Sequence, residues 1–270
     1  MTKTNRVSPR SPVSCLNRPS IMKLFNELIH SLPEGQVVHV NIGLHWTAVV
    51  VEGESGEQCG LASTLHDEHS HGIADIPDAG KLEGSDAFDL ASYILEDGAT
   101  KSSVGMATIN ALLPRKPNTW VNLNAEDVIA EKGAGKSVVL IGHFPFISRL
   151  EKKVGRLTVL ELNPQPGDHP VSIANEVIPN ADVVAITSMT LLNKTLNHLL
   201  EMIRPEATVI MLGPTTPLSP ILFDYGVDLL CGSIVDDIQP VLQAIRQGAN
   251  FRQVHKAGVH LVSIAKPSRS

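Results

Sequence analysis

The chain has 270 residues, of which 43% are hydrophobic, and this is enough for one large or two ordinary domains with a sizeable core. A formal net charge of −6, with no dense stripe of lysine and arginine, argues against nucleic acid as a partner. The 3 cysteines are widely separated and lack C-x-x-C spacing, which argues against a disulfide framework or a thiolate zinc site and favours the cytoplasm. No apolar run approaches the roughly 20 residues that cross a bilayer, so no membrane partner is expected.

Residues 1–19 differ in composition from the rest of the chain. They contain basic residues and prolines but no acidic residue. A transit peptide shares this bias, but repeated proline would interrupt the amphipathic helix that such a peptide needs. The composition therefore favours a disordered tail.

Residues 20–122 are predicted to form an α+β domain. A helix is expected to begin at Ile21, with Ser20 as its cap, and to end before Pro33. Three β-like segments separated by glycine-containing turns then predict an antiparallel meander at residues 36–41, 45–51 and 59–65. Two helices complete the unit, one at 88–95 behind a Ser85 cap and one at 101–113.

Residues 123–270 alternate short apolar, β-branched runs with helical segments. Strands that are apolar at almost every position are buried on both faces, which is typical of a parallel sheet flanked by helices. We therefore expect a Rossmann-like α/β domain. Its strands are predicted at residues 138–141, 157–162, 183–187, 208–212, 229–230 and 259–265, and its helices at 125–131, 147–153, 191–203 and 238–247.

The loops that follow four of these strands are rich in Gly, Pro, Ser, Thr and Asn. They lie at residues 142–146, 161–164, 187–190 and 213–220. Ordinary loop composition would account for any one of them. Because ligands of open parallel sheets bind beyond the carboxyl ends of the strands, four such loops at one edge predict a binding site.

Glu161 follows Gly142 at nearly the interval at which dinucleotide-binding folds place an acidic residue for a ribose hydroxyl. This spacing suggests a nucleoside. Against a conventional NAD site, the first loop lacks the later glycines of G-x-G-x-x-G and carries Phe144, Pro145 and Phe146 where a pyrophosphate needs close backbone approach. Glu161 could equally cap a neighbouring helix or pair with a base.

Histidines and carboxylates crowd one loop at residues 66–71. Imidazole and carboxylate groups are ligands for zinc, nickel, copper or iron, so this loop is a candidate site for a transition metal ion. Solvated loops also collect such residues, and a short tract binds metals adventitiously. The candidate metal ligands are His66, His69, His71 and His143.

Motifs for catalysis are missing from the sequence. There is no Gly-x-Ser-x-Gly elbow and no His-Glu-x-x-His. The Gly-Ala-Gly-Lys-Ser run at residues 133–137 ends like a P-loop, but it precedes a strand, whereas a P-loop links a strand to the following helix. We expect it to be a flexible entry to the strand.

Several of these runs together resemble the heavy-metal chelation family. They are GHFPF at 142–146, ITSMTLLNKTL at 186–196, LGPTTPLSP at 212–220 and FDYGVDLLCG at 223–232, with VGMATINA at 104–111 and IGLHWT at 42–47. The resemblance implies an enolase N-terminal-like domain followed by a Rossmann-like domain, with the site in the cleft between them. Ser188 and Met189 depart from the Gly-Thr-like pair expected there. The cleft residues that the resemblance implies are Asn110, Gly142, Phe144, Pro145, Glu161, Asn163, Thr190, Asn193, Gly213, Pro214, Thr216 and Ser219.

The function predicted from these features is the binding or handling of a heavy metal or metal complex between the domains. The alternative is an enzyme that acts with a nucleoside-containing small molecule, of S-adenosyl or dinucleotide type, at the strand ends. The expected partner is a small molecule or metal complex, and a homodimer is left open.

Overall fold

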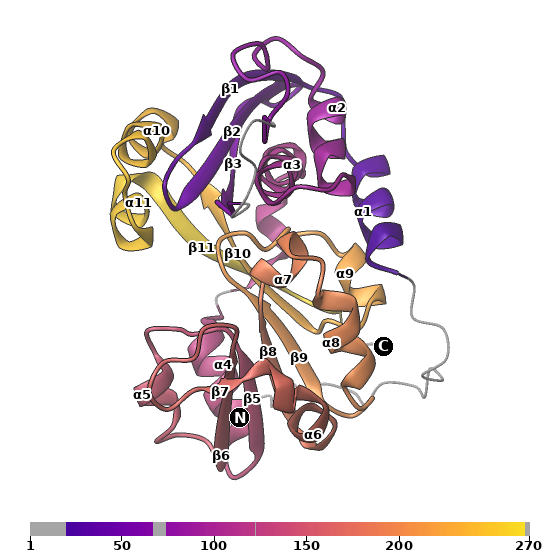
Figure 1. Ribbon diagram of the computed structural model, residues 1–270, viewed down its shortest axis with the longest axis vertical. Helices are drawn as coiled ribbons and strands as arrows, with labels where there is room; N and C mark the ends of the chain where they lie inside the picture. Colours follow the sequence, from indigo (N-terminus) through magenta and orange to yellow (C-terminus); the bar gives the residue numbers. More distant parts are fainter. Residues whose placement is uncertain (1–19, 67–73, 122, 268–270) are drawn as a thin grey trace.

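The computed structural model describes residues 20–66, 74–121 and 123–267 (Figure 1). They form two sheets, one of three antiparallel strands and one of eight mostly parallel strands. The smaller sheet lies at one end of the molecule and the larger one at the other (Figure 1). This is the two-domain α/β arrangement predicted from the sequence.

The N-terminal half begins with α1 (Ile21–His30), whose apolar residues 24, 25, 28 and 29 are buried. The Ser20 side chain accepts a hydrogen bond from the Lys23 N–H, which confirms the predicted cap. The meander follows as β1 (Gln36–Ile42), β2 (Trp46–Gly53) and β3 (Gly56–Ser63), paired in that order.

The next helices are α2 (Ala87–Ala91), the 3-10 turn η1 (Ser92–Leu95) and α3 (Ala99–Leu112). The predicted Ser85 cap is wrong. The Ser85 hydroxyl donates to the Leu82 carbonyl, and Asp86 accepts from the Phe88 N–H instead. Helix α3 is buried almost all round and packs on β2 and β3.

The larger sheet has the order β7-β6-β5-β8-β9-β10-β11-β4. From β7 to β10 all strands are parallel, and this part has the 3-2-1-4-5-6 order of doubly wound sheets. The two remaining strands differ from the expected parallel sheet, because β11 pairs antiparallel with β10, and β4 with β11. The strands are β4 (Trp120–Val121), β5 (Ser137–Ile141), β6 (Arg156–Glu161), β7 (His169–Pro170), β8 (Val183–Thr187), β9 (Thr208–Leu212), β10 (Leu229–Val235) and β11 (Val259–Ala265).

Short helices connect these strands. The single helix predicted at 191–203 is wrong, because the chain breaks at Lys194, whose φ of 58° is left-handed. The helix predicted at 147–153 is also shorter than expected. The connecting segments are η2 (Pro117–Thr119), α4 (Ala125–Gly133), α5 (Ile147–Leu150), η3 (Val171–Ile173), α6 (Ala174–Val177), η4 (Ile178–Asn180), α7 (Met189–Leu192), α8 (Leu196–Met202) and α9 (Ile221–Asp224).

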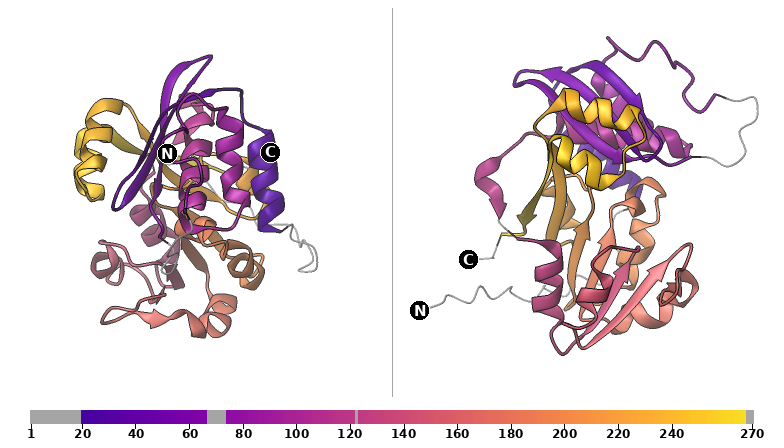
Figure 2. Two further views of the ribbon diagram at one scale, coloured as in Figure 1. Left: turned by 45° about the horizontal axis from the view of Figure 1, so that its top comes forward. Right: turned by 90° about the vertical axis from the view of Figure 1, so that its left-hand side faces the viewer.

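Helices α10 (Ile238–Arg246) and α11 (Phe251–Gly258) leave the larger sheet and cover the outer face of the smaller one (Figures 1 and 2). Their apolar side chains form one buried cluster with Trp46 and other residues of β2 and β3. Helix α11 was not predicted, although Asn250 and Gln253 form a capping box at its start. The domain boundary between residues 122 and 123 stays a prediction. The α10–α11 hairpin belongs to the C-terminal half of the chain but packs on the N-terminal sheet.

A second buried cluster joins α1, α2 and α3 to strands β5, β8 and β9, so the two halves share one continuous core. Within the part of the chain that the structure describes, no helix combines the length and apolarity needed to cross a membrane. The apolar packing of this second cluster crosses the predicted domain boundary and holds the two halves together.

The crossing of α3 over β3 depends on Gly60. A Cβ at this position would lie 2.1 Å from the Ala107 carbonyl oxygen and 2.2 Å from the Ala111 nitrogen. Because backbone, which cannot rotate away, occupies this space, Gly60→Ala should lower the free energy of unfolding by about 3 kcal/mol, measured by urea denaturation. Gly53→Ala, with its nearest neighbour at 3.3 Å, is the control. Equal stabilities of the two variants would contradict this packing.

Candidate functional site

The carboxyl ends of the central strands are in register at one edge of the larger sheet. Ile141 of β5 pairs with both Leu160 of β6 and Ile186 of β8, and Thr187 pairs with Leu212 of β9. The loops after β5, β6, β8 and β9 therefore start side by side, as the sequence predicts. We call this group of loops the strand-end loops.

Two glycines let the strand-end loops approach one another. Gly142 has a φ of 102°, and a Cβ there would lie 3.0 Å from that of Thr187. Gly213 has a φ of 124°, and its Cβ would lie 2.7 Å from the Ser188 hydroxyl. Both the left-handed backbone and the close contacts require glycine. Ser188 is buried at this contact, which gives the unexpected serine of the loop a packing role.

The two site residues predicted in the β8 loop, Thr190 and Asn193, form hydrogen bonds with neighbouring residues of the same segment. Thr190 is buried, and its hydroxyl donates to the Thr187 carbonyl over 2.7 Å. Asn193 is exposed, and its amide oxygen accepts from the Thr195 N–H and hydroxyl. These contacts shape the turn between α7 and α8.

The loop after β9 contacts the N-terminal domain. The Pro214 carbonyl accepts from the Ser233 hydroxyl of β10, and Ser219 is buried beside α9. The Thr215 hydroxyl oxygen accepts a hydrogen bond from the Ser63 N–H of β3 over 2.9 Å. Thr216 is 1% exposed, and its hydroxyl has no hydrogen-bond partner among the described residues.

Asn110 of α3 joins this loop to the N-terminal domain by hydrogen bonds, and its place in a ligand cleft stays a prediction. Its amide nitrogen donates to the Leu61 carbonyl over 2.8 Å and to the Thr215 carbonyl over 3.1 Å. Asn110, Ser63 and Thr215 thus form the hydrogen-bonded junction of the two domains. Sequence reasoning missed Ser63 and Thr215, because a serine at a strand end and a threonine in a polar loop carry no signal of a contact this distant.

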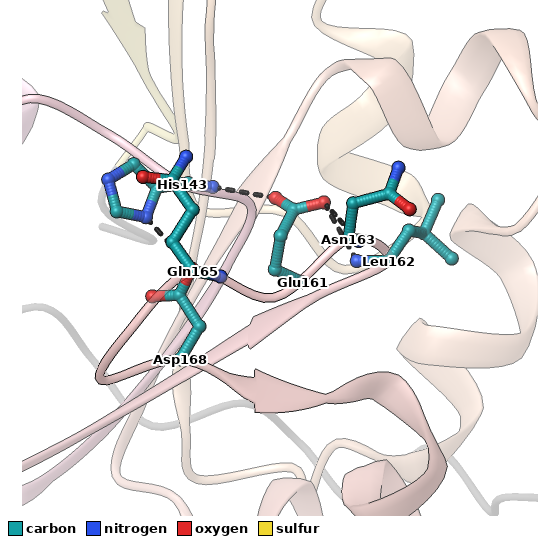
Figure 3. Close-up of polar contacts among 6 residues, drawn as sticks. All are labelled: His143, Glu161, Leu162, Asn163, Gln165 and Asp168. Atoms are coloured by element: carbon teal, nitrogen blue, oxygen red, sulfur yellow. Dashed lines mark hydrogen bonds and ion pairs between the residues drawn. The ribbon is translucent and has the colours of Figure 1, made fainter.

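Glu161 lies between His143 and Asn163 and binds backbone (Figure 3). One carboxylate oxygen accepts the His143 N–H over 2.9 Å. The other accepts the N–H groups of Leu162, over 2.7 Å, and Asn163, over 3.4 Å. Glu161 thus fastens the β5 loop to the end of β6, and a contact with ribose stays a prediction.

The aromatic residues of the β5 loop pack against each other. The rings of Phe144 and Phe146 are stacked, with centroids 5.3 Å apart, and both pack on the buried cluster around Leu140. Pro145 between them is exposed. The two aromatic side chains that argue against a pyrophosphate site are thus packed side by side in the β5 loop.

Of the predicted metal ligands, His66 is exposed, while His69 and His71 lie outside the described residues. The ring of His143 pairs with Asp168. Over residues 20–66, 74–121 and 123–267, no three His, Cys, Asp or Glu side chains come together as a metal site. The residues of α10 and its C-cap, Gln239, Pro240, Gln243, Arg246 and Gln247, line a shallow pocket. Helix α10 lies away from the strand-end loops (Figure 1).

Two cysteines of the described chain are buried and free. Burial raises the pKa of the Cys59 thiol to about 12, against a smaller lowering by Arg115. Burial also raises the pKa of Cys231 to about 11, although the Ser263 hydroxyl donates to its sulfur. Because metals bind the thiolate, both are poor ligands at neutral pH.

The fold and the junction define a two-domain α/β protein whose N-terminal domain covers the strand ends of the larger sheet. Family models described as "Putative heavy-metal chelation" match both halves, one over residues 25–113 and the other over residues 124–262. The second match alone spans more than half of the chain. The chain belongs to this heavy-metal chelation family.

Known relatives resemble the chain over most of its length. An uncharacterized protein of Methanocaldococcus jannaschii is 24% identical over 233 residues, which cover 82% of this chain and 86% of that protein. A crystal structure of a DUF364-family protein of unknown function from Desulfitobacterium hafniense has a TM-score of 0.77 at 24% identity, covering 91% of this chain and 99% of that one. Another from Pyrococcus horikoshii has a TM-score of 0.75 at 23% identity, covering 94% and 100%. These structures share the fold.

The cysteine environments predict thiols that do not react in the folded protein. At pH 8, iodoacetamide should leave Cys59 and Cys231 unmodified, because a raised pKa keeps the thiolate fraction small and burial blocks access. Both should react in urea. Mass spectrometry of peptides measures each cysteine separately, and rapid labelling of either in the native protein would contradict their burial.

The contacts of Glu161 predict a stabilising role. Glu161→Gln replaces one acceptor oxygen by an NH2 group that faces a backbone N–H. The free energy of unfolding, measured in urea, should therefore fall by about 1 kcal/mol. The control is Glu131→Gln, whose carboxylate is exposed and contacts only the neighbouring Lys132 among the described residues. If both variants unfold like the wild type, the carboxylate does not fasten the β5 loop.

Proposed function

We propose that the protein binds a heavy metal, carried by a small molecule, where the strand-end loops meet the N-terminal domain. Two kinds of observation support this. The family to which both halves belong is described by heavy-metal chelation. The junction also lies at the carboxyl edge of a doubly wound sheet, the place where such sheets bind ligands.

The single observation that carries the proposal is the hydroxyl of Thr216. It is buried, and no described residue bonds to it. An unpaired buried polar group costs about 1–3 kcal/mol, so it calls for an explanation such as a bound water or a bound ligand. At this position, beside Thr215 and the Asn110 amide, the role proposed is to bond a ligand.

The chemistry of the junction favours a carried metal over a bare ion. The groups that meet at the neighbouring Thr215 are hydroxyls, backbone carbonyls and the Asn110 amide, all neutral. Soft and borderline metals prefer thiolate and imidazole ligands, and among the described residues no three His, Cys, Asp or Glu side chains come together to hold a bare ion. Neutral oxygens instead suit the polar groups of an organic chelator.

A nucleoside-containing ligand is the second candidate. The strand order and the interval from Gly142 to Glu161 favour it. Against it, both oxygens of Glu161 already accept backbone N–H groups. The two candidates differ in the ligand that stabilises the fold.

A thermal-shift panel separates them. We would use protein without an affinity tag and test Zn²⁺, Ni²⁺ and Cu²⁺, their iminodiacetate chelates, S-adenosyl compounds and dinucleotides. A ligand at about 100 times its dissociation constant stabilises the folded state by about 2.7 kcal/mol. Stabilisation by a chelate supports the proposal, and stabilisation by nucleosides alone would replace it with the second candidate. No stabilisation by any metal or chelate at millimolar concentration would refute it.

Thr216→Val tests the junction itself. Valine keeps the shape of threonine and removes a hydroxyl that bonds to no described residue, so the stability of the free protein should stay equal or rise. Affinity for the chelate identified by the panel should fall about tenfold, equivalent to about 1.4 kcal/mol, by calorimetric titration. Thr108→Val, which removes an equally buried hydroxyl inside α3, is the control and should leave affinity unchanged. Unchanged affinity in Thr216→Val would remove this residue from the site.

A further inference from the structure

His143 is held in place both by its backbone and by its ring. It follows Gly142 at the end of β5, and its N–H donates to Glu161. Its ring nitrogen Nδ1 lies 2.9 Å from the Asp168 carboxylate (Figure 3). The second ring nitrogen, Nε2, points away from both carboxylates (Figure 3). Position and orientation of the imidazole are thus fixed by two separate acidic residues.

Asp168 is itself fixed. Its side chain is 2% exposed, and the oxygen that faces His143 also accepts the Gln165 N–H over 3.0 Å. A carboxylate only accepts hydrogen bonds, so the proton of the neutral ring resides on Nδ1. The lone pair is then on Nε2. The His143 side chain is 34% exposed, and because Nδ1 faces Asp168, Nε2 is the ring nitrogen left for a ligand from solvent.

The other histidine–carboxylate pairs of the described chain are different. His39 pairs with Glu83 over 3.1 Å, and His260 with Asp236 over 2.5 Å. In both pairs the carboxylate is more than half exposed, so water competes for it. Burial of the carboxylate and a second hydrogen bond to it distinguish His143 from these two.

We propose that Nε2 of His143 is a metal ligand, with Asp168 as its positioning residue. Histidines that bind metals almost always donate the other ring N–H to a carboxylate, carbonyl or water, which sets the tautomer and raises the basicity of the ligand. The arrangement of His143 and Asp168 has this form before any metal arrives. Imidazole suits copper, nickel, zinc and iron.

The proposal extends to the class of ligand, and here it rests on the proposed function. No two further donor side chains in residues 20–66, 74–121 and 123–267 join His143 into a three-donor site. A metal already held by a chelator needs only one more bond from the protein. The Nε2 lone pair displaces one water from such a complex, and no electron or proton is transferred.

The test uses the full chain labelled with ¹⁵N-histidine and the copper(II)–iminodiacetate complex as the probe. Copper(II) broadens the imidazole resonances of the ring that it binds. With substoichiometric probe, the signals of His143 should broaden before those of His39 and His260. If His143 broadens no earlier than these two, the proposal is wrong.

Variants separate the ligand from its positioning residue. His143→Ala should lower affinity for the probe at least tenfold. Asp168→Asn should lower it 10- to 100-fold, as happens when the residue that hydrogen-bonds a metal-binding histidine is changed. Glu83→Gln is the matched control, because it alters the exposed pair of His39, and should leave affinity unchanged. Urea denaturation checks that each variant is folded. Wild-type affinity in a folded Asp168→Asn protein would remove Asp168 from this role, and the same result for His143→Ala would refute the proposal.

The outcomes also separate this site from the junction. If the probe binds the wild type and Thr216→Val weakens it while His143→Ala does not, the proposed function stands and the inference about His143 fails. If His143→Ala weakens binding and Thr216→Val does not, His143 is a metal ligand and the junction proposal fails.

Discussion

Burial of both faces of the three-stranded sheet is the constraint on which the rest of the structure depends. Strand β2 is buried at six successive positions, so neither face can be left to solvent. Helix α3 covers one face, and the hairpin α10–α11 covers the other. Because that hairpin comes from the C-terminal half, β10 and β11 must run up to the small sheet, as the views of Figure 2 show. The two halves are therefore locked together by their cores.

This lock places the loops after β8 and β9 directly against the N-terminal domain. Polar contacts then complete the apolar packing. Asn110 and Ser63 reach Thr215, and the Tyr225 hydroxyl donates to Glu27 of α1 over 2.8 Å. Burial, with the hydrogen bond to Glu27 next, raises the pKa of Tyr225, so this bond persists at neutral pH. The ligand proposed for the junction would meet groups whose positions are set by the fold, which would lower the ordering cost of binding.

The β5 loop shows how the same sheet order can serve different chemistry. In dinucleotide-binding sheets, this loop is glycine-rich and the acidic residue of the next strand binds ribose. Here Phe144 and Phe146 fill the loop, and Glu161 binds its backbone. The result is an oriented imidazole at His143, backed by Asp168. The β5 loop thus presents an oriented imidazole, whereas the β9 loop presents neutral hydroxyl and carbonyl groups at the junction.

The sequence alone determined the elements whose signals are local. The Ser20 cap, the meander and the apolar parallel strands were predicted because capping and two-sided burial leave their mark within a few residues. The strand-end loops followed from the same reasoning. Only the tertiary structure decided that α10 and α11 cover the other domain's sheet, that the chain breaks at Lys194, and that Asp168 holds His143. Each depends on contacts between segments distant in the chain, or on a backbone conformation that tertiary packing imposes against local propensity.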